Sequence, residues 1–120
     1  DTTMFILKPN SDKPCIDLYP QSQWEDISTK LKTLDRFQPE VQEFLIHFLR
    51  GHQPVTIDKA KRIAIPPQLK AEFSIGKEVV LVTILDMIQI WDAEEYQNYT
   101  NKKPKNFYDI TKQALRNKND

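Results

Sequence analysis

The sequence predicts an α+β fold made of two copies of one strand–helix unit. Segments 15–24 and 87–96 share one pattern at a constant offset of 72 residues: a short apolar strand, an aromatic at its end, a helix start, and an aromatic on the helix. Apolar runs of strand length precede both segments, at 4–8 and 79–83. With 120 residues and 39% hydrophobic side chains, the chain has room for one domain containing both copies.

The first copy is predicted to begin with a β-hairpin. Met4–Lys8 and Cys15–Tyr19 are strand-like, and the residues between them, including two prolines, an asparagine and an aspartate, favour a turn. A helix is expected to follow from Pro20. Ser22 and Glu25 fit a capping box at its start, in which each side chain accepts a bond from the other's backbone N–H.

The segment between the two copies is predicted to be a helix. Pro39 suits its first turn, because the missing N–H has no helical partner there. Gly51 suits the left-handed residue that ends a helix. His47 and His52 lie at or just beyond this end and are interpreted as surface or capping histidines.

A charged turn opens the second copy. The β-branched runs Val55–Ile57 and Ile63–Ile65 flank Asp58–Arg62, and Pro66 stops the second run because proline cannot donate to a ladder. We therefore expect a hairpin whose tip projects positive charge into water.

The remainder of the second copy repeats the first. A short helix is expected over 68–73, then strands over 78–84 and 87–91 with a turn at Asp86 between them. Asp92 and Glu95 form a second predicted capping box. A polar, basic stretch then leads to a last, short amphipathic helix over 107–115.

Charge is unevenly distributed along the chain, although the formal total is zero. The net charge is +3 over residues 58–70, −5 over 71–101 and +4 over 102–120. Local patches attract polyanions, so the neutral total does not argue against a nucleic-acid partner. The basic tail is interpreted as a solvated end, with a second DNA-contacting arm as the alternative.

Enzymatic and metal-binding functions are not indicated. Cys15, the single cysteine, allows no internal disulfide, favours a reducing cytoplasm, and is expected to be a small core residue. The two histidines and the cysteine lack metal-ligand spacing, and no Gly-rich phosphate loop is present. Glu94 and Glu95 start a helix, where carboxylates favourably face the dipole. We expect no catalytic residue, cofactor, metal, small-molecule substrate or membrane partner.

These motifs resemble those of the MraZ family of bacterial transcriptional regulators, in the AbrB-like swapped-hairpin superfamily. The family signature D-x-x-x-R, followed by an apolar–x–apolar–Pro run, is matched by Asp58–Pro66. Its two strand–aromatic–helix junctions are matched by 17–24 and 88–96, and its interrepeat helix by 41–51. The resemblance covers residues 4–100, which is most of the chain.

The resemblance implies a fold and a domain plan. Two pseudo-repeats of a β-hairpin/strand–helix unit would form an AbrB-like swapped-hairpin β-barrel with flanking helices. Residues 1–50 would be the first repeat with the interrepeat helix, 51–100 the second repeat, and 101–120 a basic tail. The first repeat lacks its D-x-x-x-R part here, and we expect about 30 residues carrying that copy to be disordered, removed or outside the sequence. Lys61 stands where the family usually has glycine, which would allow a different turn.

The resemblance also implies a function. The chain would bind double-stranded DNA sequence-specifically at promoter direct repeats of the division and cell wall gene cluster, as a ring-shaped homo-oligomer that is cytoplasmic and nucleoid-associated. Its D-x-x-x-R loops would make the contacts. The alternative is a non-enzymatic protein-interaction or assembly module, or an antitoxin-like AbrB-type dimer, that binds a partner through residues 107–115.

Physical chemistry suggests roles within the loop. Lys59 and Lys61 would neutralise phosphates, and Arg62 could bond guanine bidentately in the major groove. Asp58 would either hold Arg62 or stabilise the turn. If Arg62 is instead the brace of the turn, the two lysines carry the contact. A loop with three cations binds DNA with a Kd of about 10⁻⁴ to 10⁻⁶ M, so tight binding requires several loops on one DNA.

Overall fold

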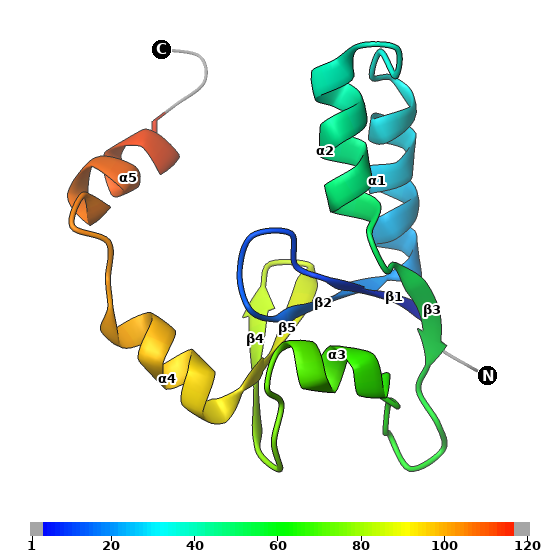
Figure 1. Ribbon diagram of the computed structural model, residues 1–120, viewed down its shortest axis with the longest axis vertical. Helices are drawn as coiled ribbons and strands as arrows, with labels where there is room; N and C mark the ends of the chain where they lie inside the picture. Colours follow the sequence, from blue (N-terminus) through cyan, green and yellow to red (C-terminus); the bar gives the residue numbers. More distant parts are fainter. Residues whose placement is uncertain (1–3, 117–120) are drawn as a thin grey trace.

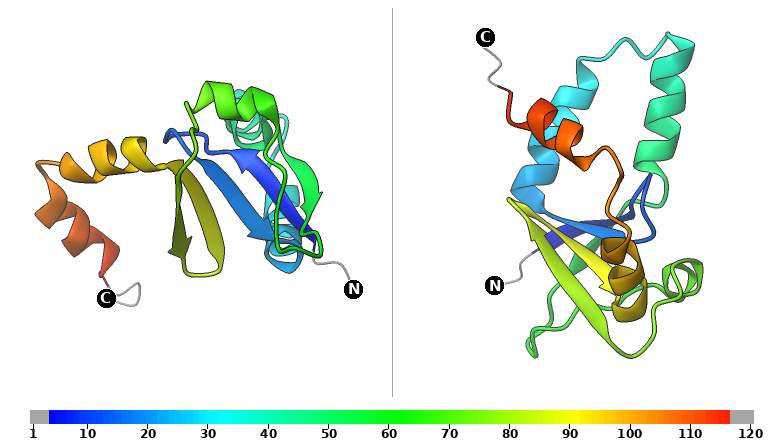
Figure 2. Two further views of the ribbon diagram at one scale, coloured as in Figure 1. Left: turned by 90° about the horizontal axis from the view of Figure 1, so that it is seen from below. Right: turned by 90° about the vertical axis from the view of Figure 1, so that its left-hand side faces the viewer.

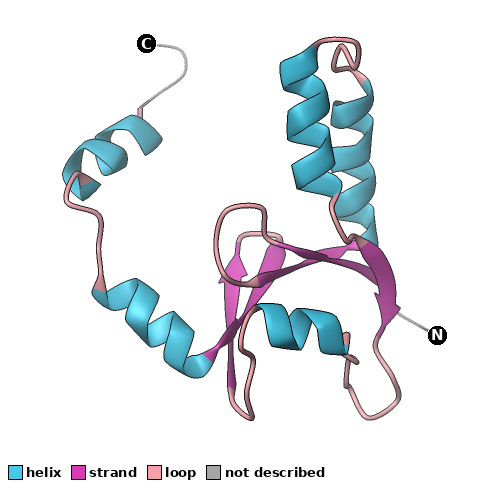
Figure 3. Cartoon of the chain, in the orientation of Figure 1, coloured by secondary structure: helices cyan, strands magenta, loops and turns pink. Residues whose placement is uncertain are grey.

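The structure, a computed structural model, describes residues 4–116. These residues form one five-stranded sheet flanked by helices (Figures 1 and 3). In chain order the elements are β1 (Met4–Pro9), β2 (Ile16–Pro20), α1 (Gln21–Lys32), α2 (Pro39–Leu49), β3 (Gln53–Thr56), α3 (Pro67–Glu72), β4 (Val79–Ile84), β5 (Met87–Asp92), α4 (Ala93–Asn101) and α5 (Phe107–Ala114). The predicted α+β class is confirmed.

The sheet has the strand order β3-β1-β2-β5-β4, and every neighbouring pair is antiparallel. The expectation of a closed barrel is wrong for the described residues. Closure requires the two edge strands to pair with each other. Here the edges, β3 and β4, are at opposite ends of the strand order, and each pairs with only one neighbour.

The two copies meet at the centre of the sheet, between β2 and β5. Asp17 pairs with Gln89, Ile16 with Ile90, and Leu18 with Ile88. Gln89 is 72 residues after Asp17, so Asp17 pairs with its own repeat equivalent. Ile16 pairs with the equivalent of Leu18, and Leu18 pairs with the equivalent of Ile16. This register relates the copies by a local two-fold axis through the Asp17–Gln89 pair. The domain boundaries at residues 50 and 100 stay a prediction.

The core lies where β1, β2 and β5 pack against α3, which crosses one face of the sheet (Figure 2). Its buried apolar members are Leu7, Ile16, Leu18, Leu69, Phe73 and Ile90. Leu69 of α3 and Phe73 directly after it thus complete a core whose other members come from the three strands.

The hairpin expected around the charged turn is only half formed. β3 pairs with β1, with Val55 opposite Phe5, whereas Ile63–Ile65 belongs to no strand. The alternation of this run is still correct, because Ile63 and Ile65 are half-buried against the core and Ala64 is exposed. Apolar periodicity predicts the buried face, but a ladder also requires a neighbouring strand, and the run has none.

One of the two predicted capping boxes has the expected N-cap, and the other does not. Asp92 Oδ2 accepts the Glu95 N–H at 3.2 Å, which confirms Asp92 as the N-cap of α4. Ser22 does not cap α1, because this helix starts directly after Pro20 and Ser22 lies within its first turn. Gly51 has a φ of +69°, as expected beyond α2. His52 Nδ1 lies 2.7 Å from the Leu49 carbonyl oxygen, so His52 is a capping histidine as predicted.

The helices that follow the two copies are arranged differently. α1 and α2 lie side by side, with the Trp24 and Phe48 rings stacked at a centroid distance of 6.2 Å (Figure 1). α4 packs Tyr96 and Tyr99 against Trp91, and α5 then stands away from the sheet (Figures 1 and 2). Between residues 4 and 116, none of the helices has the length and apolar character to cross a membrane.

Candidate nucleic-acid interface

The predicted site residues share one loop, 57–66, which connects β3 to α3. The loop lies at the end of the molecule remote from the tip of the α1–α2 pair (Figures 1 and 2). Asp58, Lys59, Lys61 and Arg62 are all exposed. The loop is therefore accessible to a large, flat partner.

The turn is held by three short backbone-centred bonds. The Asp58 N–H donates to the Arg62 carbonyl at 2.9 Å, and the Lys61 N–H donates to the Asp58 carbonyl at 3.0 Å. The Arg62 N–H donates to Asp58 Oδ1 at 2.9 Å. A turn tied at both ends in this way has a defined backbone, from which the exposed side chains extend.

Lys61 adopts the left-handed conformation, with a φ of +65°. For a residue with a Cβ, this conformation costs about 1–2 kcal/mol relative to the right-handed one. Lys61 therefore keeps the positive φ that glycine would supply and adds a cation to the loop. Replacing glycine by lysine would allow a different turn, but the backbone here is the one that glycine favours. Strain held at such a position marks the loop as a functional candidate.

Asp58 performs both of the roles that the sequence left open. Its Oδ1 caps the turn, and its Oδ2 lies 3.4 Å from Arg62 Nε. The Arg62 side chain remains 77% exposed, and its terminal nitrogens make no hydrogen bond within residues 4–116. The Arg62 guanidinium thus approaches Asp58 through its inner nitrogen, and no described residue pairs with its outer edge. That edge is the part of arginine that makes bidentate bonds.

Lys61 differs from the other two cations in its surroundings. It helps to line an apolar hollow of about 320 Å³ between the loop and β4, together with Ile63 and Leu81. Its aliphatic stem covers apolar surface while the residue stays exposed, as long cationic side chains commonly do. Lys59 and Arg62 are therefore the cations with the least contact to the protein body.

Sequence reasoning missed a buried ion pair in the first repeat. Lys8 Nζ lies 3.5 Å from Asp17 Oδ2, and the two side chains are 1% and 4% exposed. Asn10 donates to the same carboxylate at 3.0 Å, and Lys8 Nζ sits 4.5 Å from the Phe48 ring centroid. Burial lowers the pKa of Lys8, although Asp17 opposes this shift. A charged residue inside an apolar strand, as in Met4–Lys8, was the available signal.

This buried pair has no access to nucleic acid and is structural. Cys15 is also fully buried, and burial raises its thiol pKa to about 12, which confirms it as a core residue. Among residues 4–116, no three His, Cys, Asp or Glu side chains are grouped so as to hold a metal ion. The charged loop is the arrangement best suited to bind a partner.

Comparisons with known proteins indicate the family of the whole chain. The profile of a family described as "MraZ protein, putative antitoxin-like" matches residues 48–118. A "Transcriptional regulator MraZ" of Flavobacterium psychrophilum is 30% identical over 116 residues, covering 97% of this chain and 74% of the relative. Proteins of the same name from Christiangramia forsetii and Thermoanaerobacter sp. (strain X514) are 27% and 32% identical, over 94% and 88% of this chain and 73% of each relative.

Proposed function

The chain belongs to the MraZ family of transcriptional regulators, which is not an enzyme family, and we propose that it binds double-stranded promoter DNA through the Asp58–Arg62 loop. The targets we propose are direct repeats in the promoter of the division and cell wall gene cluster. One observation carries the proposal: Asp58 caps the turn from which Arg62 extends, and the Arg62 side chain is 77% exposed with no described partner on the outer edge of its guanidinium.

The loop suits base recognition in the major groove. An arginine bonds the O6 and N7 atoms of guanine through two parallel N–H groups, and such a pair discriminates by about 1–3 kcal/mol. Asp58 caps the turn, so the backbone that carries Arg62 is ordered before binding, which lowers the entropy lost in the complex. Lys59, exposed beside it, would neutralise a phosphate and add affinity without sequence information.

Tight binding requires more than one loop. One loop with three cations gives only a non-specific Kd of about 10⁻⁴ to 10⁻⁶ M. We propose a ring-shaped homo-oligomer that presents several loops to consecutive direct repeats, so that each later contact forms at high effective concentration. The proposed location is the cytoplasm, in association with the nucleoid.

The experiment is fluorescence anisotropy with a fragment that contains the direct repeats and with a scrambled fragment. Arg62→Ala should weaken binding to the repeats by about 5- to 150-fold and bring it close to the affinity for scrambled DNA. Lys59→Ala should weaken both equally and reduce the salt slope by about 1. Asp58→Asn keeps the carbonyl oxygen that caps the turn but removes the charge pair, so an intermediate loss is expected.

Two further variants serve as matched tests. Lys61→Gly preserves the positive φ and removes a cation, which separates the shape of the turn from its charge. Lys30→Ala removes an exposed lysine from α1 and should leave binding unchanged. Unaltered binding of the Arg62→Ala and Lys61→Gly variants to the repeats, together with salt-independent capture of a protein partner, would favour the interaction module instead.

A further inference from the structure

The α5 helix exposes an apolar side without a partner in the described chain. Phe107 and Ile110 are each 42% exposed, and Leu115, just beyond the helix, is 80% exposed. In the first repeat the second helix, α2, packs on α1, whereas α5 has swung away from α4 (Figure 1). A helix of eight residues is marginal alone in water, so α5 gains stability from any surface that covers this side.

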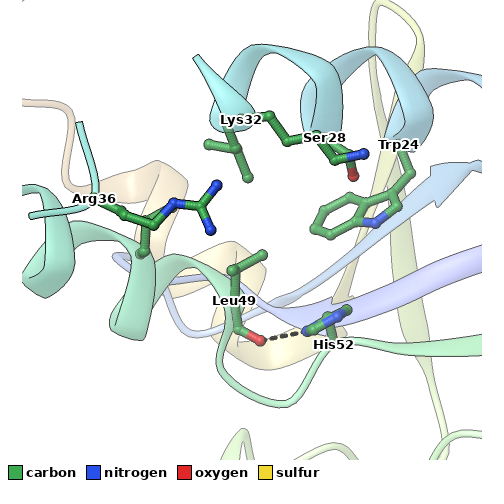
Figure 4. Close-up of a pocket in the computed structure, with 8 residues that line it drawn as sticks. Trp24, Ser28, Lys32, Arg36, Leu49 and His52 are labelled. Carbon is green, nitrogen blue, oxygen red and sulfur yellow. Dashed lines mark hydrogen bonds between the residues drawn. The ribbon is translucent and has the colours of Figure 1, made fainter. Parts of the chain in front are cut away.

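The chain also contains an open groove between α1 and α2. The groove has a volume of about 320 Å³, and half-buried Trp24, Leu31, Leu45 and Leu49 line it. Lys32 and Arg36 are at its edge, and the guanidinium of Arg36 points into the space (Figure 4). Within residues 4–116, neither of these two cations has an ion-pair partner.

The two surfaces are complementary in chemistry. On α5, Ile110 and Ala114 are exposed beside Asp109. Asp109 is exposed and makes no ion pair with any described residue. Exposed apolar side chains with one carboxylate beside them therefore match an apolar groove with two cations at its edge.

We propose that α5 of one copy docks in the α1–α2 groove of a second copy. Ile110 and Ala114 fill the groove, and Asp109 pairs with Arg36 and Lys32. The two surfaces lie on opposite flanks of one molecule, so α5 meets the groove of another copy (Figure 1). Such a head-to-tail contact repeats from copy to copy and yields a closed ring or an open filament. This inference rests on the proposed function, because it names the contact that assembles the DNA-binding ring.

Mass photometry of the full chain tests the contact. Ile110→Asp and Asp109→Lys on α5, and the pair Lys32→Glu with Arg36→Glu in the groove, should each reduce the assembly to monomers. The groove variants alter exposed side chains and leave its apolar lining intact. Tyr108→Asp is the matched control: it adds the same charge on the opposite side of α5, at a residue that is 73% exposed, and should keep the wild-type mass.

Mixing two variants, and exchanging the charges across the proposed contact, test whether α5 of one copy binds the groove of another. A chain with Ile110→Asp keeps an intact groove, and a chain with Lys32→Glu and Arg36→Glu keeps an intact α5. Their mixture should therefore give particles of twice the monomer mass, because only one head-to-tail contact can form. Asp109→Lys combined with the two groove changes in one chain should restore the wild-type mass through reversed charges.

Three results would overturn the inference: a monomeric wild-type chain, a wild-type mass in the Ile110→Asp variant, or an equal loss of mass in Tyr108→Asp. Failure of the proposed function is separate, because the Arg62→Ala measurement concerns DNA affinity and leaves α5 and the groove intact.

Discussion

The two repeats place different chemistry at equivalent positions. In the first repeat, Asp17 binds the buried Lys8, and the Tyr19 hydroxyl lies 3.5 Å from its Oδ2. In the second, the equivalent of Asp17 is Gln89, whose Oε1 accepts the indole N–H of Trp91, the equivalent of Tyr19, at 3.0 Å. The β2–β5 pair thus has a charged polar centre in β2 and a neutral polar centre in β5.

Strand geometry therefore sets the need of each central side chain for a hydrogen-bond partner but not the identity of that partner. Each central polar side chain is buried beside the local two-fold axis, so each must be hydrogen-bonded. The first repeat satisfies this need with an ion pair covered by Phe48 from α2, and the second with a single neutral bond. Through Phe48, the α1–α2 pair therefore contacts the polar centre of the sheet in the first repeat, whereas no described residue of α5 makes such a contact in the second.

The largest expected effect comes from removing the charged centre. Asp17→Ala leaves Lys8 buried without its counter-ion and should lower the free energy of unfolding by about 3–5 kcal/mol. Gln89→Ala leaves only the indole N–H of Trp91 unpaired and should cost about 1–3 kcal/mol. Urea denaturation of both variants measures the difference.

A matched control separates charge from packing at this centre. Lys8→Met with Asp17→Leu replaces the ion pair by apolar groups and should be far less destabilising than Asp17→Ala alone. Equal losses in Asp17→Ala and Gln89→Ala would contradict the distinction between a charged and a neutral centre.

The second prediction concerns alkaline pH. Burial raises the pKa of Cys15 from 9.0 to about 12, and burial followed by the charge of Asp17 raises that of Tyr19 from 10.0 to about 12. The folded chain therefore holds these protons over a range in which the unfolded chain releases them. The stabilisation is complete below pH 9 and is lost as pH rises to about 12.

Two substitutions test whether this loss of stability at alkaline pH arises in the first repeat. The equivalents of Cys15 and Tyr19 in the second repeat, Met87 and Trp91, do not titrate. Cys15→Ala with Tyr19→Phe should make the fall in unfolding free energy between pH 9 and 12 shallower, because Lys8 remains in both chains and cancels in the comparison. Parallel pH profiles for the variant and the wild type would refute the assignment.

The smallest expected effect distinguishes the two helix starts. Asp92 accepts N–H groups from Glu95 and Gly76, and these bonds lower its pKa, whereas α1 has no side-chain cap. Asp92→Ala should lower Tm by a few degrees at neutral pH, and this difference should shrink as acid protonates the carboxylate. Ser22→Ala should leave Tm unchanged. A larger loss from Ser22→Ala than from Asp92→Ala, in thermal unfolding followed by circular dichroism, would reverse the assignment.

Much of the local structure follows from local pattern. The hairpin strands, the breaks at proline and glycine, and the loop of Asp58–Arg62 depend on neighbouring residues, so periodicity and turn chemistry predict them. The strand expected at Ile63–Ile65 did not form because no neighbouring strand among the described residues pairs with it. The cap expected at Ser22 failed because α1 starts at Gln21, which places Ser22 inside the first turn.

The α+β class, the 72-residue echo and the exposed charged turn follow from the sequence alone, because all three are set by short-range spacing. The open sheet and the buried Lys8–Asp17 pair became visible only in the folded chain. These features depend on which distant strands and side chains meet once the core is packed. The sequence pattern fixes which face of each element is apolar, but partners in space fix which polar groups become paired.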